Sequence, residues 1–131
     1  MGNHMRIFIM CPVRNAKPET NDKIAAYVAK LESEGYEVYW PHRDNPYQKT
    51  DPIGLEIILC NREKMVGADE IHIWYDKDST GSIFDLGMFF ALVRTQVFKK
   101  FVIINRDDIE PTSHKSFENI VLAFEKRYRK G

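Results

Sequence analysis

Four short apolar runs, each followed by a stretch with helical spacing, constrain this chain more than any other feature of its sequence. The runs are Met5–Cys11, Tyr36–Trp40, Glu70–Tyr75 and Lys99–Asn105. Short apolar runs of this kind are typical of strands that are covered on both faces in a parallel sheet. Strict alternation of strand and helix favours an α/β fold with right-handed crossovers and helices on both faces. We expect a parallel sheet of four to five strands in the order 2-1-3-4.

The stretches between these runs carry the periodicity of amphipathic helices. The four expected helices run from Thr20 or Asn21 to Gly35, from Asp51 to Gly67, from Ser82 to about Arg94, and from Thr112 or Ser113 into the basic KRYRK segment. The third of them is apolar on almost every side, and a helix of that kind is buried. In a domain this small we expect part of it to face another subunit, in a homodimer or a larger homo-oligomer.

Composition limits what the chain can bind. Nineteen basic and nineteen acidic residues leave no formal net charge, so we expect a small molecule rather than a nucleic acid polymer. No apolar run approaches the roughly 20 residues of a membrane span, so no membrane association is expected. Cys11 and Cys60 lack the spacing of a zinc site, which indicates reduced thiols in the cytoplasm and implies neither a metal nor a cofactor. All 131 residues are expected to form one domain, with residues 1–4 as a cloning remnant ahead of a natural start at Met5.

The loop between the third strand and the third helix holds the densest chemistry in the chain. Within ten residues it carries Asp76, Asp78, Ser79, Thr80, Gly81, Ser82 and Asp85. In the order 2-1-3-4 the chain reverses direction between strands one and three, so this loop should face the loop after Cys11, which carries Arg14. Ligands of open α/β sheets bind in such a crevice, at the carboxyl ends of the strands. We therefore expect the binding site here.

Each candidate residue also has a purely structural interpretation. Ser82 and Asp85 have a spacing close to that of a capping box, so Asp85 is either a helix cap or a carboxylate nucleophile held ionised by the helix dipole. Ser79, Gly81 and Ser82 suit an anion-binding helix N-terminus, and they suit a tight turn equally. Arg14 is either a partner for a phosphate or carboxylate or a solvated surface arginine. These alternatives stay open at the level of the residues.

Four motifs spread over nearly the whole chain occur together in one enzyme superfamily. They are PHRDNPYQ, D-x-x-G, the N-R-x-x-x-x-x-A-D segment from Asn61 to Asp69, and D-x-x-S-x-G-S-x-F-D-L-G. The chain thereby resembles the nucleoside 2-deoxyribosyltransferase superfamily. That superfamily includes transferases that move deoxyribose between bases and hydrolases that cut the N-glycosidic bond of nucleoside 5′-monophosphates. The resemblance implies a flavodoxin-like three-layer α/β/α sandwich and a nucleoside or nucleotide ligand.

The resemblance also implies catalytic roles for two carboxylates. The nucleophilic carboxylate of the family precedes a hydrophobic residue and a glycine, and it falls on Asp85 of Asp85-Leu86-Gly87. The family usually has glutamate here, so the shorter aspartate retracts the carboxylate by roughly 1 Å or more. Asp76 corresponds to the aspartate after the third strand, which would orient the sugar or protonate the leaving base. The implied mechanism retains configuration through a glycosyl-enzyme intermediate.

Three further residues resemble the substrate-binding groups of the hydrolases. Ser79 and Gly81 are similar to the residues that contact the phosphate, and Arg14 is similar to the arginine of the first loop that holds the substrate. The competing expectation is a non-catalytic nucleotide-binding or signalling module. In that module the same crevice would retain a nucleotide while Asp85 only caps a helix. Release of a base from candidate nucleosides separates the two.

Overall fold

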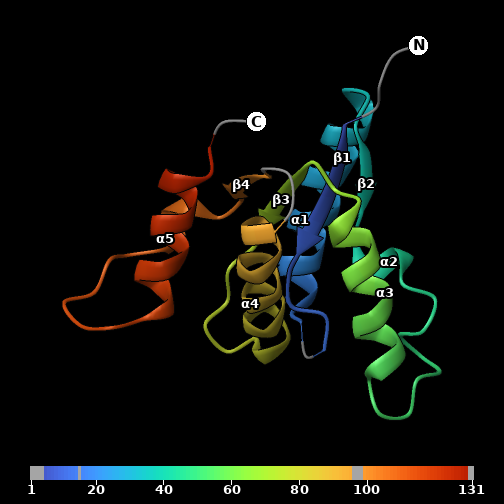
Figure 1. The fold of residues 1–131 in the computed structure, drawn as a ribbon. Helices are drawn as coiled ribbons and strands as arrows, with labels where there is room; N and C mark the ends of the chain where they lie inside the picture. Colours follow the sequence, from blue (N-terminus) through green and yellow to red (C-terminus); the bar gives the residue numbers. More distant parts are fainter. Residues whose placement is uncertain (1–4, 15, 96–98, 130–131) are drawn as a thin grey trace.

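A four-stranded, fully parallel sheet forms the centre of the fold (Figure 1). The computed structural model describes residues 5–14, 16–95 and 99–129, and the cloning remnant expected at residues 1–4 lies outside these ranges. The strands of the sheet are β1 (Arg6–Met10), β2 (Glu37–Tyr39), β3 (Glu70–Ile73) and β4 (Lys100–Ile103). They lie in the order β2-β1-β3-β4, which confirms the α/β class and the strand order expected from the sequence.

Helices cover both faces of this sheet, in unequal number. The helices are α1 (Pro18–Ser33), α2 (Pro41–Asp44), α3 (Leu55–Val66), α4 (Thr80–Thr95) and α5 (Phe117–Arg127), with a short 3₁₀ turn, η1 (Arg106–Asp108), after β4. Helix α1 packs on one face, and α3, α4 and α5 pack on the other (Figure 1). The three layers form a flavodoxin-like sandwich. No helix in the described part of the chain is long and apolar enough to cross a membrane.

Each face of the sheet has its own apolar core. Neighbouring residues of a strand point to opposite faces, so Phe8 and Ile9 of β1 enter different cores. Phe8 packs in the core that contains Phe89 of α4 and Phe124 of α5, whereas Ile9 packs in the core that contains Ile24 of α1. Both strand residues are completely buried, as expected of a central parallel strand.

Helix α4 is buried on one side and exposed on the other. Leu86 and Phe89 pack in the core of the three-helix face. By contrast, Phe84 and Phe90 retain 53% and 56% of their surface. The expectation that this helix is buried is therefore confirmed for one side of α4. The other side presents two aromatic rings to solvent.

Two helices begin at different residues from those expected. Helix α1 begins at Pro18 instead of following a cap at Thr20 or Asn21, because proline at the first helical position has no N–H to leave unpaired. Helix α5 begins after Ser116, whose side chain accepts the N–H of Asn119 at 3.2 Å. The cap expected at Thr112 or Ser113 is therefore wrong, since Ser116 lies closer to the first apolar turn.

The polar segment after β2 is more structured than expected. It opens with α2, in which the Asp44 carboxylate accepts the N–H of Trp40 at 2.9 Å and closes the turn. Helix α3 begins only at Leu55, not at Asp51. Asp51 instead reaches forward from the loop, and its carboxylate accepts the N–H of Ile57 at 2.9 Å. A side chain outside the helix thus satisfies one of the amides that the first turn leaves free.

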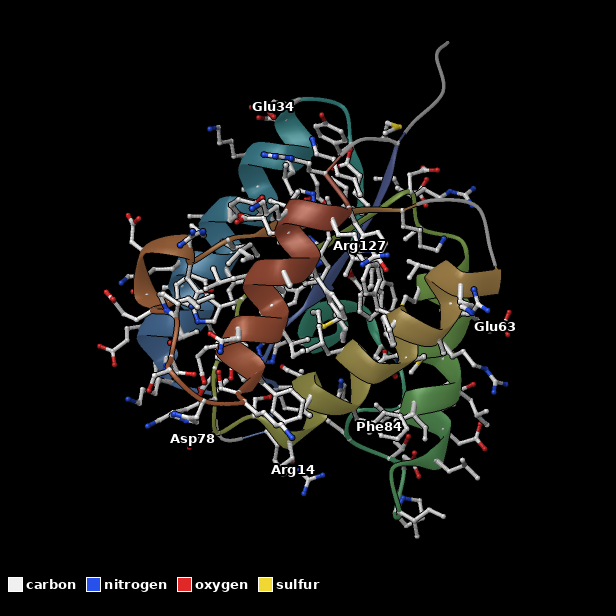
Figure 2. The ribbon with its side chains drawn as sticks, turned by 60° about the vertical axis from the view of Figure 1, so that its left-hand side comes forward. Arg14, Glu34, Glu63, Asp78, Phe84 and Arg127 are labelled. Atoms are coloured by element: carbon white, nitrogen blue, oxygen red, sulfur yellow. The ribbon has the colours of Figure 1, made fainter. Side chains whose placement is uncertain are left out.

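The pairing of β1 with β3 brings the two candidate loops together. Met10 pairs with Ile73, and the N–H of Trp74 donates to the Met10 carbonyl at 2.9 Å. The loops that follow β1 and β3 therefore leave the sheet at the same edge, which is called the carboxyl edge below. Figure 2 shows Arg14, from the first loop, and Asp78, from the second, at this end of the molecule.

Candidate active site at the carboxyl edge

A tight turn after β3 leads directly into α4. Oδ1 of Asp76 accepts the N–H of Asp78 at 2.9 Å, and the Asp76 carbonyl accepts the N–H of Ser79 at 3.0 Å. Such side-chain bonds to the following backbone are the usual reason for aspartate in a turn. Oδ2 of Asp76 has no hydrogen-bond partner among residues 5–14, 16–95 and 99–129. Asp76 therefore shapes the turn with one oxygen, and its other oxygen has no partner in the described structure.

Ser79 is the cap of α4. Its Oγ accepts the N–H of Ser82 at 3.2 Å and donates to Oγ of Ser82 at 2.9 Å, while its carbonyl accepts the N–H of Ile83 at 3.2 Å. The backbone amide of Ser82 is therefore already paired. Its side chain is enclosed, because the residue is only 1% exposed. The structure thus brings Ser79 and Ser82 together at the helix start, as a capping pair.

The free donors at this helix start come from the two residues after the cap. In the described structure, the backbone N–H groups of Thr80 and Gly81 have no acceptor. Both residues are exposed, and a Cβ added to Gly81 would meet no atom within 4 Å. Arg14 is exposed at the same end of the molecule, and it makes no ion pair or hydrogen bond with any described residue. Free amides, the helix dipole and an unpaired guanidinium favour an anion here.

Asp85 lies in the second turn of α4. Because the helix begins at Thr80, its first turn contains no acidic residue. The interpretation of Ser82 and Asp85 as a capping box is therefore wrong, since Ser79 already satisfies the Ser82 amide. Asp85 is 8% exposed, and its carboxylate has no hydrogen bond or ion pair in the part of the chain that the structure describes.

Burial raises the pKa of the Asp85 carboxyl from its usual 3.8 to about 7. Removing a carboxylate from water disfavours its charged form, and no cation or donor among the described residues compensates. The carboxyl group therefore populates both protonation states near neutral pH, which is the range in which acid, base and nucleophilic catalysis operate. A carboxyl group perturbed in this way, at the ligand-binding edge of an α/β sheet, is a marker of a functional site.

Two residues near the candidate site were not predicted as part of it from the sequence: Cys11, which interacts with Asp85, and Trp40, which lies next to Cys11. Burial raises the pKa of the Cys11 thiol to about 12, opposed by the Trp40 indole N–H and reinforced by the Asp85 carboxylate. The thiol thus stays protonated and does not compete as a nucleophile. Nε1 of Trp40 is buried and lies near this thiol, but it meets the geometry of a hydrogen bond with no described residue. The available signal was position, because Cys11 and Trp40 end the first two apolar runs, and adjacent parallel strands end at one edge.

The buried histidine of β3 is a core residue whose ring nitrogens both have partners. Nδ1 of His72 lies 2.6 Å from the Tyr27 hydroxyl, and Nε2 lies 2.8 Å from a carboxylate oxygen of Glu70. Burial lowers the pKa of His72, partly opposed by Glu70, so the neutral ring accepts from Tyr27 and donates to Glu70. Both ring nitrogens are therefore used for structure.

A cleft of about 460 Å³ lies away from these residues, at the amino ends of β1 and β2. Its charged lining residues are Arg6, Arg43, Lys64, Glu37, Asp44 and Glu63. These charges balance, and Arg43 is bonded to Asp44 at 2.7 Å and to Glu32 at 3.0 Å. We place the candidate site at the carboxyl edge instead, because the buried carboxyl group without a partner lies there.

Comparisons with known proteins identify no family for this chain. No model of a known protein family matches the chain, and no curated protein matches its sequence. Among residues 5–14, 16–95 and 99–129, no group of three or more His, Cys, Asp or Glu side chains is placed to hold a metal ion. The groups at the carboxyl edge that could take part in chemistry are therefore carboxylates, backbone amides and an arginine.

We predict that Asp85→Asn stabilises the protein in a pH-dependent manner. The unfolded chain ionises Asp85 at its ordinary pKa, whereas the folded chain resists ionisation up to about pH 7. The penalty is absent below about pH 4 and grows as the pH rises to about 7. At about pH 8 the variant should therefore gain on the order of 2 to 4 kcal/mol in free energy of unfolding, and at about pH 4 it should gain little.

Urea unfolding at both pH values measures this difference. Asp78→Asn, at an exposed position of the preceding turn, is the matched control and should show no such pH-dependent gain. An equal change for Asp85→Asn at both pH values would contradict the desolvation of the carboxylate.

Proposed function

We propose that this chain is an enzyme similar to the nucleoside 2-deoxyribosyltransferases, which cleaves or transfers at the N-glycosidic bond of a nucleoside or nucleoside 5′-monophosphate. The observation that carries the proposal is Asp85, a buried carboxyl group without a partner in the described structure, in the second turn of a helix that starts at the carboxyl edge. A buried ionisable group without a partner lowers stability, so its presence at a ligand-binding edge calls for a functional explanation.

The proposed reaction uses Asp85 as the nucleophile. Its ionised carboxylate attacks the anomeric carbon, the bond between sugar and base breaks, and the base leaves with the bonding electron pair and takes up a proton. Water or a second base then attacks the same carbon, which releases the sugar from Asp85 and restores the carboxylate. The free Oδ2 of Asp76 is suited to hold a sugar hydroxyl or to assist the proton transfer.

The helix start supports the nucleotide form of the substrate. The amides of Thr80 and Gly81 and the guanidinium of Arg14 are donors without acceptors in the described structure, and a 5′-phosphate would satisfy them. Ser79 contributes by holding the first turn of α4 in place. The second candidate function is a nucleotide-binding module without catalysis, and the free donors at the helix start favour it equally. Asp85 distinguishes the two, because binding of an anion does not require a buried carboxyl group.

We predict that Asp85→Asn lowers base release by about three orders of magnitude or more, because asparagine keeps the shape but cannot act as the nucleophile. For the wild-type protein, kcat/KM should rise with pH to a plateau, with the midpoint of the rise near pH 7, since only the ionised carboxylate attacks. Nucleosides and nucleoside 5′-monophosphates incubated with the protein and separated by liquid chromatography provide the measurement. Asp78→Asn is the control and should retain activity.

The exchange Asp85→Glu tests the length of the nucleophile. If the shorter aspartate retracts the carboxylate from the sugar, glutamate restores the reach that is usual in the superfamily and raises the rate. Wild-type protein and Asp85→Glu protein that both bind nucleotides but release no base would reject the enzyme and support the binding module.

We predict that Arg14→Ala weakens binding of nucleoside 5′-monophosphates by about tenfold or more and leaves binding of the matching nucleosides unchanged. Its guanidinium is exposed and unpaired in the described structure, so its loss removes a phosphate partner without disturbing an internal bond. Calorimetric titration measures both affinities. Arg94→Ala, which removes an exposed arginine from the far end of α4, is the matched control. Equal effects on nucleosides and nucleotides would reject the phosphate role of Arg14.

We also propose that two copies of the chain associate through the exposed side of α4. Phe84 and Phe90 present apolar rings there, and the exposed residues from Thr80 to Ala91 include no charged side chain. Gly87 lies between the two rings, and a Cβ at this position would meet no atom within 4 Å. Glycine inside a helix costs up to about 1 kcal/mol relative to alanine, and close approach of a second helix explains its presence.

We therefore predict a homodimer that the double exchange Phe84→Ser and Phe90→Ser converts to a monomer. Light scattering coupled to gel filtration at micromolar concentration measures the mass of each form. Phe117→Ser is the matched control, because Phe117 on α5 is 51% exposed and lies outside the proposed contact. A monomeric wild-type protein, or loss of the dimer in the control, would contradict the proposed surface.

A further inference from the structure

A side chain continues the sheet where the backbone pairing of β3 and β4 ends. The backbone register closes at Ile73 and Ile103, followed by the N–H of Ile104 donating to the Ile73 carbonyl at 2.8 Å. Beyond it, Oδ1 of Asn105 accepts the N–H of Tyr75, and Nδ2 of Asn105 donates to the Tyr75 carbonyl, both at 2.8 Å. The carboxamide thus replaces the two backbone groups of a missing strand residue.

This pairing is enclosed and geometrically unique. Asn105 is buried, and Nδ2 also donates to the Asp108 carboxylate at 3.2 Å. A backbone N–H requires an acceptor and a carbonyl requires a donor, so one orientation of the carboxamide satisfies both groups of Tyr75. Tyr75 is held from its other end as well, because its hydroxyl donates to Glu118 of α5 at 2.6 Å.

The Tyr75 peptide, which Asn105 holds, directly precedes the turn and the helix that carry the candidate site residues. Asp76 follows Tyr75 directly, its turn places Ser79, and Ser79 caps the helix that carries Asp85. Along this path Asp76 is bonded to Asp78 and Ser79, and Ser79 is bonded to Ser82 and Ile83. A displacement of the Tyr75 peptide would therefore move the turn and the start of α4 together.

We propose that Asn105 is a positioning residue that sets the place and the burial of the Asp85 carboxylate through the Tyr75 peptide. Its effect on catalysis rests on the proposed function, whereas its effect on Asp85 does not. Asn105 lies two residues after the end of β4 and acts through Tyr75 and Asp76. It is therefore a positioning residue without a contact to the substrate.

Titration of Asp85 tests this role without a substrate. Carbon-13 NMR of the side-chain carboxyl groups follows the ionisation, and Asp85→Asn identifies the signal. The wild-type midpoint should lie near pH 7. In Asn105→Ala, a loosened turn admits water, so the midpoint should fall by about one pH unit or more. Asn105→Gln keeps both polar groups but is one methylene longer, so it should fold and shift the midpoint in the same direction.

Asn119 is a matched control for both variants. It pairs with the backbone of Thr112 in the same two-point manner, with bonds of 2.9 Å and 3.1 Å, in the loop before α5. Asn119→Ala and Asn119→Gln should leave the Asp85 midpoint unchanged. If Asn105→Ala does not fold, Asn105→Gln decides the question. An unchanged midpoint in the folded Asn105 variants, or an equal shift in the Asn119 variants, would overturn the proposal.

Kinetics then test the catalytic consequence. In a protein that releases base, Asn105→Gln should lower kcat by about 100-fold while KM changes by less than about threefold, because the nucleophile is displaced but the phosphate donors remain. An equal loss in Asn119→Gln would reject positioning by Asn105. A wild-type protein that releases no base rejects the proposed function, and the titration still decides whether Asn105 positions Asp85.

Discussion

The parallel pairing of β1 with β3 is the constraint on which the rest of the structure depends. Strand β1 lies between β2 and β3, and from Ile7 to Met10 both of its faces are buried. Its register with β3 brings the end of one strand beside the end of the other, through the bond from Trp74 to Met10. The first loop, the start of α4 and the thiol of Cys11 consequently meet at one edge. The chemistry of the chain is concentrated there for a topological reason.

Buried polar groups in this fold divide into satisfied and unsatisfied ones. His72 bonds through both ring nitrogens, and Asn105 bonds through its carbonyl oxygen and its amide. The hydrogen bonds of these groups replace those that they lose to water, as is usual for buried polar groups. Asp85 is different, because its burial raises the pKa of the carboxyl group and no described residue offsets the cost. This contrast within one small domain is the physical argument for a role in binding or catalysis.

Hydrogen bonds hold the chain ahead of the helix that carries Asp85. Asn105 and Glu118 hold the two ends of Tyr75, and Ser79 closes the first turn of α4. These bonds come from residues far apart in the sequence, including the segment that follows β4 and helix α5. A carboxylate on such a frame keeps its position without forming bonds of its own, which leaves its oxygens available to a ligand. Stability is thus provided around the site rather than within it.

Much of the fold followed from patterns that are local in sequence. The four strands, their order and the four longer helices were predicted because apolar runs and helical periodicity report burial directly. Helix starts were less accurate, since Pro18, Asp51 and Ser116 show how several nearby residues compete to satisfy the same free amides. The short helix α2 was missed because its closing bond, from Trp40 to Asp44, leaves no periodic signal.

The sequence by itself determined which residues lie at the carboxyl edge, because strand order and loop position together specify that edge. It placed Asp76, Ser79, Gly81, Asp85 and Arg14 there. Only the tertiary structure decided which of them are used internally and which are left without a partner. Capping depends on where α4 begins, and Asp85 interacts with Cys11, which follows a strand far away in the sequence. Such contacts are non-local, so no spacing within the loop could distinguish a helix cap from a buried carboxyl group.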